Sequence, residues 1–433
     1  MEAVRSLPAR RVLVAPEWIA AGALGASVVA SYLLAAGMAS SSTFFVTWSQ
    51  RPGFGFPGWL AGPLKGTGVL LTLPRFMFLV LALYGLYLVI VRYADAVRWS
   101  WAIAAIGVLH LVWLLAPPMW LTDVFNYLGY VRIGARHSLN PYTHFLQTVP
   151  GDPSFRWVTW PKLHSPYGPL FVAGFWPVAW LSVPAGLWAF KATVTAAAVG
   201  CVALVGRLAR ALDRPVVPAM LFVGLNPLWL AYGVGGAHND MFMLLFLLGG
   251  LLLLLRRNEA VAGAMVVMGG AIKASGGLLL PFMLIGARDR RRLLIGAAAA
   301  AAFIAVLSVI FFSSDPIAAL TSFANQGAQI SDKSFPGQVA QVLFGIDSVG
   351  SGTQAVANVL VVVVVAALVF RAWRGADWVE SASWATLALL LSLVWLMPWY
   401  IVWLLPLAAV TRDQRVRTAA LVFGAFVVLL YIP

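Results

Sequence analysis

Long runs of apolar residues recur from one end of the chain to the other, separated by short polar or basic segments. The runs are continuous, as in Leu251–Leu255 and Val361–Val365, and several approach the roughly twenty residues that a membrane-spanning helix needs. Strands of a membrane barrel would instead alternate polar and apolar residues over about ten positions. The pattern predicts an all-α, polytopic integral membrane bundle with about 11–13 hydrophobic segments, organised as one transmembrane domain over residues 1–433.

Basic residues gather between the apolar runs, and this sets the predicted orientation. Because Lys and Arg concentrate in cytoplasmic loops, the clusters at 207–214, 256–257 and 288–292 are placed inside together with the N-terminus. The predicted membrane segments are 17–39, 68–92, 99–117, 186–206, one ending near 231, 241–255, 293–312, 353–370, 381–396, 400–410 and 418–432. Residues 167–184 are predicted to be re-entrant or interfacial, and 260–287 to form a hairpin broken at Gly276–Gly277. The polar loops 40–67, 118–166, 233–240 and 313–350 then all lie outside, where we expect them to form the active-site cavity.

Composition supports the membrane assignment and removes other classes. Of 433 residues, 61% are hydrophobic and only 10% charged, whereas soluble domains average about 25% charged residues. A soluble enzyme, a disordered chain, a collagen-like fibre and a disulfide scaffold are therefore excluded. The net charge of +14 reflects the basic loops and indicates no nucleic-acid partner. The single cysteine, Cys201, rules out an intrachain disulfide, and the apolar stretch 18–38 is too long for a signal peptide.

The outer loop 118–166 carries the most informative polar residues. Asp123 comes a few residues after a predicted span, and ionisable groups close to a membrane are costly enough that they usually serve a function. A helix is predicted from Asp123 to about Arg136. Its spacing places Asp123, Tyr127 and Tyr130 on one face.

On composition alone, Asp123 could be either the N-cap of this helix or a catalytic base. Thr122 is a competing candidate for the N-cap. A second set of polar residues follows in the same loop, and a solvated loop face is the preferred interpretation for its members: Arg132, Arg136, His137 and His144.

The Gly-rich loop 233–240 holds three consecutive polar residues, His238, Asn239 and Asp240. Glycines allow a backbone to approach a ligand closely. Capping of the next span by Asp240 is the preferred interpretation, a substrate contact is the alternative, and a metal site is weakly indicated because a third ligand is missing.

Two of the five lysines lie inside or beside predicted spans. Lys273 is placed near the outer interface at the break of the hairpin, and Lys191 lies five residues inside the outer end of its span. Both could extend along the protein toward the membrane surface. Two cations beside a carboxylate would also suit the phosphate of a lipid-linked substrate. Aromatic residues such as Trp399 and Tyr400 fit the interfacial aromatic belt or a surface for stacking sugar rings.

Several segments in fixed order resemble membrane glycosyltransferases of the GT-C class. More closely, the chain is similar to actinobacterial polyprenol-phosphate-mannose-dependent α-(1→6)-mannosyltransferases of lipomannan and lipoarabinomannan synthesis. The matching segments are DVFNYLGYVRIGARHSLNPY (123–142), SPYGPLF (165–171), GLNPLWLAYGVGGAHND (224–240), AIKASGGLLLPF (271–282) and MPWYIVWLLPL (397–407). Many relatives are longer, with extra C-terminal spans.

The resemblance implies an inverting single displacement at the outer face of the plasma membrane. Asp123 matches the catalytic acidic position and would act as general base. Donor-phosphate contacts are expected from Lys273, Lys191 and His238. Substrate contacts are expected from the residues of the same motifs: Tyr127, Arg132, Asn140, Tyr142, Tyr167, Asn239, Asp240, Trp399 and Tyr400.

The implied partners are a polyprenyl-phosphate-sugar donor, a glycolipid or mannan acceptor and membrane lipid. No cofactor is expected, and a divalent metal stays open. Two alternatives also stay open. The sugar could be arabinofuranose, or the chain could transport or flip a lipid-linked sugar. A transporter needs a midplane site reachable from both faces, often with repeat symmetry, and here the polar residues lie on one side and no internal repeat is visible.

Overall fold

The computed structural model describes residues 15–40, 58–118, 123–327, 329–345 and 349–432, and within these ranges the regular secondary structure is entirely helical. The elements of the first half are α1 (Pro16–Met38), α2 (Gly58–Ala61), η1 (Gly62–Leu64), α3 (Leu73–Arg92), η2 (Ala94–Ala96), α4 (Trp99–Leu115), α5 (Asp123–Ala135), η3 (Leu146–Thr148), η4 (Phe155–Trp157), α6 (Pro169–Gly174), η5 (Trp176–Trp180), α7 (Val183–Ala211), α8 (Val216–Gly224) and the π-helix η6 (Trp229–Gly235). The second half contains α9 (Asp240–Leu255), α10 (Glu259–Gly270), η7 (Ala274–Leu279), α11 (Leu280–Gly286), α12 (Arg290–Phe311), α13 (Ala318–Gly327), α14 (Phe335–Phe344), α15 (Ser351–Trp373), α16 (Trp378–Ser392), η8 (Pro398–Trp403), α17 (Leu405–Val410) and α18 (Gln414–Tyr431).

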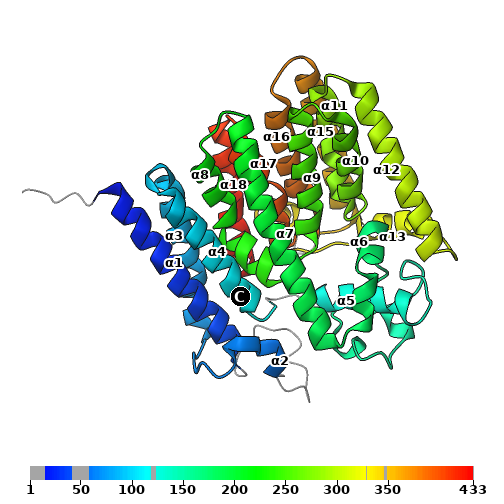
Figure 1. The fold of residues 1–433 in the computed structure, drawn as a ribbon, viewed down its shortest axis with the longest axis horizontal. Coiled ribbons are helices and arrows are strands. Elements are labelled where there is room, and N and C mark those ends of the chain that lie inside the picture. Colours follow the sequence, from blue (N-terminus) through cyan, green and yellow to red (C-terminus); the bar gives the residue numbers. More distant parts are fainter. Residues whose placement is uncertain (1–14, 41–57, 119–122, 328, 346–348, 433) are drawn as a thin grey trace, which may run out of the picture.

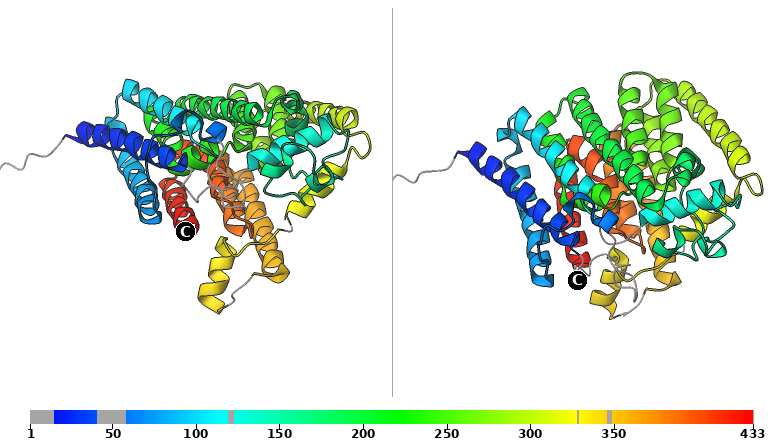
Figure 2. Two further views of the ribbon diagram at one scale, coloured as in Figure 1. Left: turned by 90° about the horizontal axis from the view of Figure 1, so that it is seen from below. Right: turned by 60° about the horizontal axis from the view of Figure 1, so that its bottom comes forward.

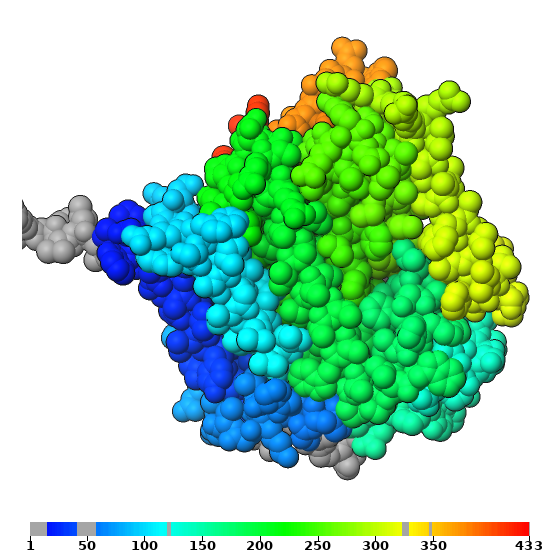
Figure 3. Space-filling view, viewed as in Figure 1, coloured from blue at the N-terminus to red at the C-terminus, as the bar shows by residue number. Residues whose placement is uncertain are grey.

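The long helices pack side by side in chain order. Helix α1 packs on α3 and α4, α7 packs on α8 and α9, and α10 lies between α9 and α12 (Figure 1). The C-terminal elements α15–α18 lie behind this layer in Figure 1, and the view from below separates them from it (Figure 2). Residues 123–182 form a compact mass of short helices and loops at one end of α9, α10 and α12 (Figure 3).

The described helices are those of a polytopic membrane protein. Six of them are long and apolar enough to cross a membrane, and the bent pair α8 and η6 would add a seventh. Five shorter apolar helices bring the hydrophobic segments to about a dozen, as the sequence pattern predicts. Their ends are set by local chemistry: Ser182, Asp289, Asp377 and Asp413 each cap a helix N-terminus through a side-chain oxygen.

Both segments predicted to be irregular are interrupted in the structure, but the break in 260–287 lies before the predicted position, because Gly276 and Gly277 fall within η7. Residues 167–184 contain only the short α6 and η5 before α7 begins, so this stretch forms no full span. Residues 260–287 are interrupted after Gly270, and Lys273 stands at the break as the residue before η7.

The segment expected to cross outward by about residue 231 bends instead by 62° between α8 and η6. Pro227 has no backbone N–H, and the Asn226 Oδ1 accepts hydrogen bonds from the N–H groups of Leu228 and Trp229 at 2.9 and 3.3 Å. The side chain of Asn226 therefore starts a new helical segment in a new direction.

Candidate active site

A cavity of about 290 Å³ opens where five parts of the chain meet. That volume lies at the lower end of small-molecule sites. Its walls come from the start of α5, the loop 159–167, the break between α10 and η7, the residue Gln329 after α13, and the start of η8 with the segment before it. The lining residues are Asp123, Thr159, Trp160, Pro161, Lys162, Leu163, Pro166, Tyr167, Lys273, Gln329, Trp395, Met397, Trp399 and Tyr400.

The cavity wall contains the carboxylate of Asp123, the first residue of α5. Trp160 Nε1 donates to Oδ1 at 3.1 Å, and the hydroxyl of Tyr167 donates to Oδ2 at 3.5 Å. Burial raises the pKa of Asp123 to about 6, against the lowering effects of Trp160, Lys273 and Tyr167. A carboxylate with this pKa is ionised at neutral pH and is a stronger base than an exposed one.

Helix α5 forms over the predicted residues and presents the predicted face. Tyr127 lies one turn after Asp123, and its ring meets the Tyr167 ring edge-on at 4.7 Å. Its hydroxyl lies 3.3 Å from His238 Nδ1 and 3.5 Å from Asn239 Oδ1. The same helix face therefore joins the cavity to the loop 233–240, which is more than a hundred residues away in sequence.

Lys273 reaches the cavity as predicted, and its ammonium group is already paired. Nζ lies 2.8 Å from Asp240 Oδ1, which also accepts a 2.5 Å hydrogen bond from Trp403 Nε1. The ammonium lies 4.4 Å from the Tyr400 ring centroid and 5.1 Å from that of Trp403. Asp240 is thus the anchor of Lys273, and the interpretation of Asp240 as the cap of the next span is wrong. Asn239 occupies the N-cap position of α9, without a side-chain cap.

His238 lies behind the cavity, where it does not line the wall. Its ring stacks on Trp399 at a centroid distance of 3.6 Å, and its Nδ1 lies 4.0 Å from Asp123 Oδ2. Burial and the charge of Lys273 lower the pKa of His238 well below the usual value, so the imidazole is neutral at physiological pH. His238 Nε2, Asn239 Nδ2 and Asp240 Oδ2 are buried and have no hydrogen-bond partner among the described residues.

Lys191 is fully buried inside the bundle, so the expectation that it extends toward the membrane surface is wrong. Its ammonium donates to the carbonyl oxygens of Trp113 at 3.2 Å and Gly235 at 2.7 Å. These bonds fix the end of η6 against α4 and α7, and Lys191 does not line the cavity.

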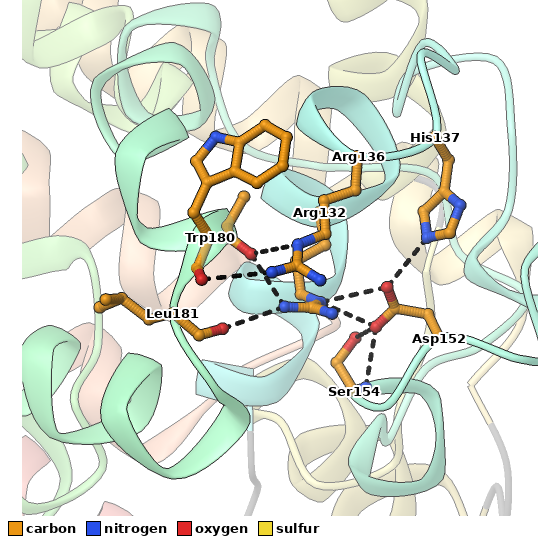
Figure 4. A network of polar contacts seen from close by, with 8 residues as sticks. Arg132, Arg136, His137, Asp152, Ser154, Trp180 and Leu181 are labelled. Carbon is orange, nitrogen blue, oxygen red and sulfur yellow. Dashed lines mark hydrogen bonds and ion pairs between the residues drawn. The ribbon is translucent and has the colours of Figure 1, made fainter.

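Arg132 is buried, and the interpretation of a solvated loop face is wrong for it (Figure 4). Its Nε lies 2.8 Å from Asp152 Oδ1, and its Nη1 donates to the carbonyl oxygens of Ala179 and Leu181. Asp152 also accepts hydrogen bonds from His137 and Ser154.

These bonds outweigh burial and hold the pKa of Asp152 well below its usual range. Arg132, His137, Asp152 and Ser154, which we call the Arg132 clamp, tie α5 to the loop after it and to η5, and Arg132 does not line the cavity. Arg136 and His137 are exposed, as predicted.

Asn140 and Tyr142 lie in a turn that packs against the end of α12. Asn140 Oδ1 accepts from the Tyr142 N–H at 2.9 Å, and its Nδ2 donates to the carbonyl oxygen of Asp315 at 3.0 Å. The Tyr142 ring meets Phe312 edge-on. Neither residue lines the cavity.

The predicted outer loops contribute unequally to the cavity. From 313–350, Gln329 lines the wall, whereas residues 233–240 lie behind it. From 40–67, none of the described residues lines it, and 41–57 lie outside the described ranges, as does Thr122. Within the described ranges, no three His, Cys, Asp or Glu side chains come together as a metal site.

Sequence reasoning missed several lining residues, above all Lys162 and Trp395. The scarcity of lysine, which singled out Lys191 and Lys273, applies equally to Lys162. Trp395 precedes the 397–407 motif by two residues, and no spacing rule indicates that it stacks edge-on against Trp160 at 5.7 Å.

Comparison with known proteins shows the family of the chain. Residues 19–288 match the N-terminal domain of the alpha-(1→6)-mannopyranosyltransferase family MptA/B. The chain belongs to this family. Residues 333–433 match the MptB C-terminal domain. The Asp123 cavity is built from both matched regions, because Trp395, Met397, Trp399 and Tyr400 come from the second.

A curated relative, alpha-(1→6)-mannopyranosyltransferase Rv1459c of Mycobacterium tuberculosis, is 30% identical over 145 residues. The match covers 30% of this chain and 23% of that relative, so it spans less than a quarter of the relative's length. No solved structure matches the chain.

Proposed function

We propose that this protein is a mannosyltransferase that uses polyprenyl-phosphate mannose and elongates a mannan or lipoglycan acceptor at the outer face of the plasma membrane. The α-linkage, expected to be 1→6, would arise by inversion of a β-linked donor. The observation that carries the proposal is a buried carboxylate, Asp123, with a pKa raised to about 6, in the wall of a cavity rich in Trp and Tyr. Family membership supports mannose as the transferred sugar.

In the proposed reaction Asp123 accepts the proton of the acceptor hydroxyl while that oxygen bonds to the anomeric carbon. The bond from this carbon to the phosphate oxygen breaks, and polyprenyl phosphate leaves with the bonding electron pair. General-base assistance of this kind contributes about 10²–10⁴ to the rate. The leaving group is already an anion, so no second carboxyl group is needed to protonate it. Cationic side chains that line the cavity would stabilise its charge.

The side chains around Asp123 suit this role. Trp160 and Tyr167 each donate to a different carboxylate oxygen, which fixes the plane of the carboxyl group. Of the three predicted phosphate ligands, Lys273 alone lines the cavity. His238 supports Trp399 from behind, and Lys191 holds the backbone of η6, so we assign both to the construction of the site.

A transfer assay tests this function. Purified protein is offered polyprenyl-phosphate mannose or polyprenyl-phosphate arabinose with short α-mannoside acceptors, with and without EDTA. We expect mannose transfer alone. If arabinose is transferred, the proposed mechanism stands and the donor sugar is arabinose. If the protein still binds the lipid donor but transfers neither sugar, the proposal that it is an enzyme is contradicted. Activity that EDTA removes would add a divalent metal to the mechanism.

A further inference from the structure

The cavity contains a second lysine that the proposed reaction does not yet use. Lys162 lines the wall with its four sequence neighbours Thr159, Trp160, Pro161 and Leu163. Its side chain is exposed, and within the described ranges no carboxylate pairs with its ammonium group.

The charge on Lys273 is compensated, and the charge on Lys162 is not. Lys273 is bonded to Asp240 at 2.8 Å and enclosed by Tyr400 and Trp403. The charged residues that line the cavity are Asp123, Lys162 and Lys273. Asp240 does not line the cavity and is bonded to Lys273. Among the described residues of the wall, Lys162 is therefore the cation that has no carboxylate bonded to it, and an arriving phosphate can pair with it.

The backbone on both sides of Lys162 is fastened to the helix that carries Asp123. The Asn126 Oδ1 accepts hydrogen bonds from the N–H groups of Thr159 and Trp160, and its Nδ2 donates to the Trp160 carbonyl oxygen. The Tyr130 hydroxyl donates to the Leu163 carbonyl oxygen at 2.9 Å. Asn126 and Tyr130 lie three and seven residues after Asp123, on the same helix face.

The loop therefore holds the backbone around Lys162 at a fixed place relative to the proposed base. Three hydrogen bonds with the Asn126 side chain and one with the Tyr130 hydroxyl fasten residues 159–163 to α5. Lys162 thus lines the same cavity as Asp123, and its long, exposed side chain can bring an ammonium group to an anionic donor bound there.

We propose that Lys162 binds the phosphate group of the lipid-linked donor. The identity of that donor is taken from the proposed function. Its ammonium group would stay with the same phosphate after the sugar has left, so it would also hold the product, a polyprenyl phosphate. Asn126 and Tyr130 are positioning residues for this contact.

Binding of a short lipid phosphate tests the proposal without requiring transfer. Farnesyl phosphate and farnesol, which differ only in the phosphate, are titrated into protein in detergent while the fluorescence of tryptophan is followed, since Trp160, Trp395 and Trp399 line the cavity. We expect the wild type to prefer farnesyl phosphate. Lys162→Gln should weaken farnesyl phosphate about tenfold, the size expected for one charge-assisted hydrogen bond, and leave farnesol unchanged.

Two further variants serve as controls. Lys162→Arg should stay within about threefold of the wild type, because it keeps the charge. Lys65→Gln, which removes an exposed lysine that does not line the cavity, should bind both lipids as the wild type does. Inorganic phosphate added as a competitor should displace farnesyl phosphate only weakly if the lipid chain also contributes to binding.

The outcomes separate this contact from the proposed function. Equal affinity of Lys162→Gln and wild type for farnesyl phosphate, or no wild-type preference over farnesol, would overturn the Lys162 contact even if mannose is transferred. Selective loss of phosphate affinity in Lys162→Gln, in a protein that transfers no mannose, would support the phosphate site and reject the mannosyltransferase proposal.

Discussion

Two buried ionic groups, the Arg132 clamp and a group in and behind the cavity wall, differ in how completely their polar atoms are bonded. In the Arg132 clamp, Asp152 accepts bonds from Arg132, His137 and Ser154, and Arg132 donates in addition to two backbone carbonyl oxygens (Figure 4). The cavity group is formed by Asp123, Asp240 and Lys273. In it, Asp240 Oδ2 has no partner within the described part of the chain, and Asp123 and Lys273 line the cavity.

The difference shows how an ion pair that only stabilises the fold can be distinguished from one that also takes part in binding or catalysis. A buried charge costs free energy unless its hydrogen-bonding capacity is filled. In the clamp, the protein itself supplies the partners of the Asp152 carboxylate. The cavity group keeps an open face, because Asp123, whose pKa is raised by burial, and Lys273 both line the cavity, and this is the arrangement expected where a substrate completes the bonding.

The largest change in the free energy of unfolding is expected when the ion pair of the Arg132 clamp is removed. Arg132→Met should lower the free energy of unfolding by about 3–5 kcal/mol, because Asp152 is left buried without its main partner. Thermal unfolding in detergent would measure this. Arg291→Gln, at an exposed arginine of α12, should change stability by less than about 1 kcal/mol. Loss of transfer in Arg132→Met protein that remains fully folded would contradict the purely structural role of the clamp.

Removing the Lys273–Asp240 ion pair should lower the free energy of unfolding less than removing the clamp does, and it should lower the transfer rate more. Lys273→Met should destabilise by about 2–3 kcal/mol, since Asp240 then loses one of two partners. Adding Asp240→Asn, which keeps the acceptor for Trp403, should restore most of that stability and leave transfer impaired. Unfolding curves and transfer rates of both proteins would check this. Wild-type transfer by the double variant would show that Lys273 serves stability alone.

The smallest change in the transfer rate is expected when the pH is varied. Burial raises the pKa of Asp123 to about 6, and a general base works only when ionised. Transfer, measured as kcat/KM, should therefore fall about tenfold per pH unit below about 6 and level off above about 7. Unfolding temperatures across the same range would exclude acid denaturation. A flat profile between pH 5 and 7 would remove Asp123 as the titrating base.

Sequence reasoning recovered the features that depend on local pattern. Apolar runs and basic loops predicted the helices, and the spacing of Asp123 and Tyr127 predicted their shared face on α5. An interruption of 260–287 was predictable because glycines stand inside an apolar run, although it was expected at Gly276–Gly277 and α10 already ends at Gly270.

Features that depend on long-range packing were not recoverable. Whether a charged side chain in a helix meets a carboxylate, a carbonyl oxygen or solvent depends on which segment packs beside it. Arg132 meets Asp152, twenty residues later, and Lys191 meets a carbonyl oxygen of η6. Nothing in the spacing around either residue names that partner, and the contribution of Trp395 to the cavity wall depends on the same kind of contact.

The most direct test of the account compares Asp123→Asn with Asp152→Asn. Because burial makes ionised Asp123 costly to the folded state, Asp123→Asn should unfold at or above the wild-type temperature while mannose transfer falls about 10²–10⁴-fold. Asp152→Asn should unfold earlier and retain the wild-type transfer rate per folded molecule. Full turnover by Asp123→Asn, or loss of turnover by well-folded Asp152→Asn, would contradict the assignment of the base.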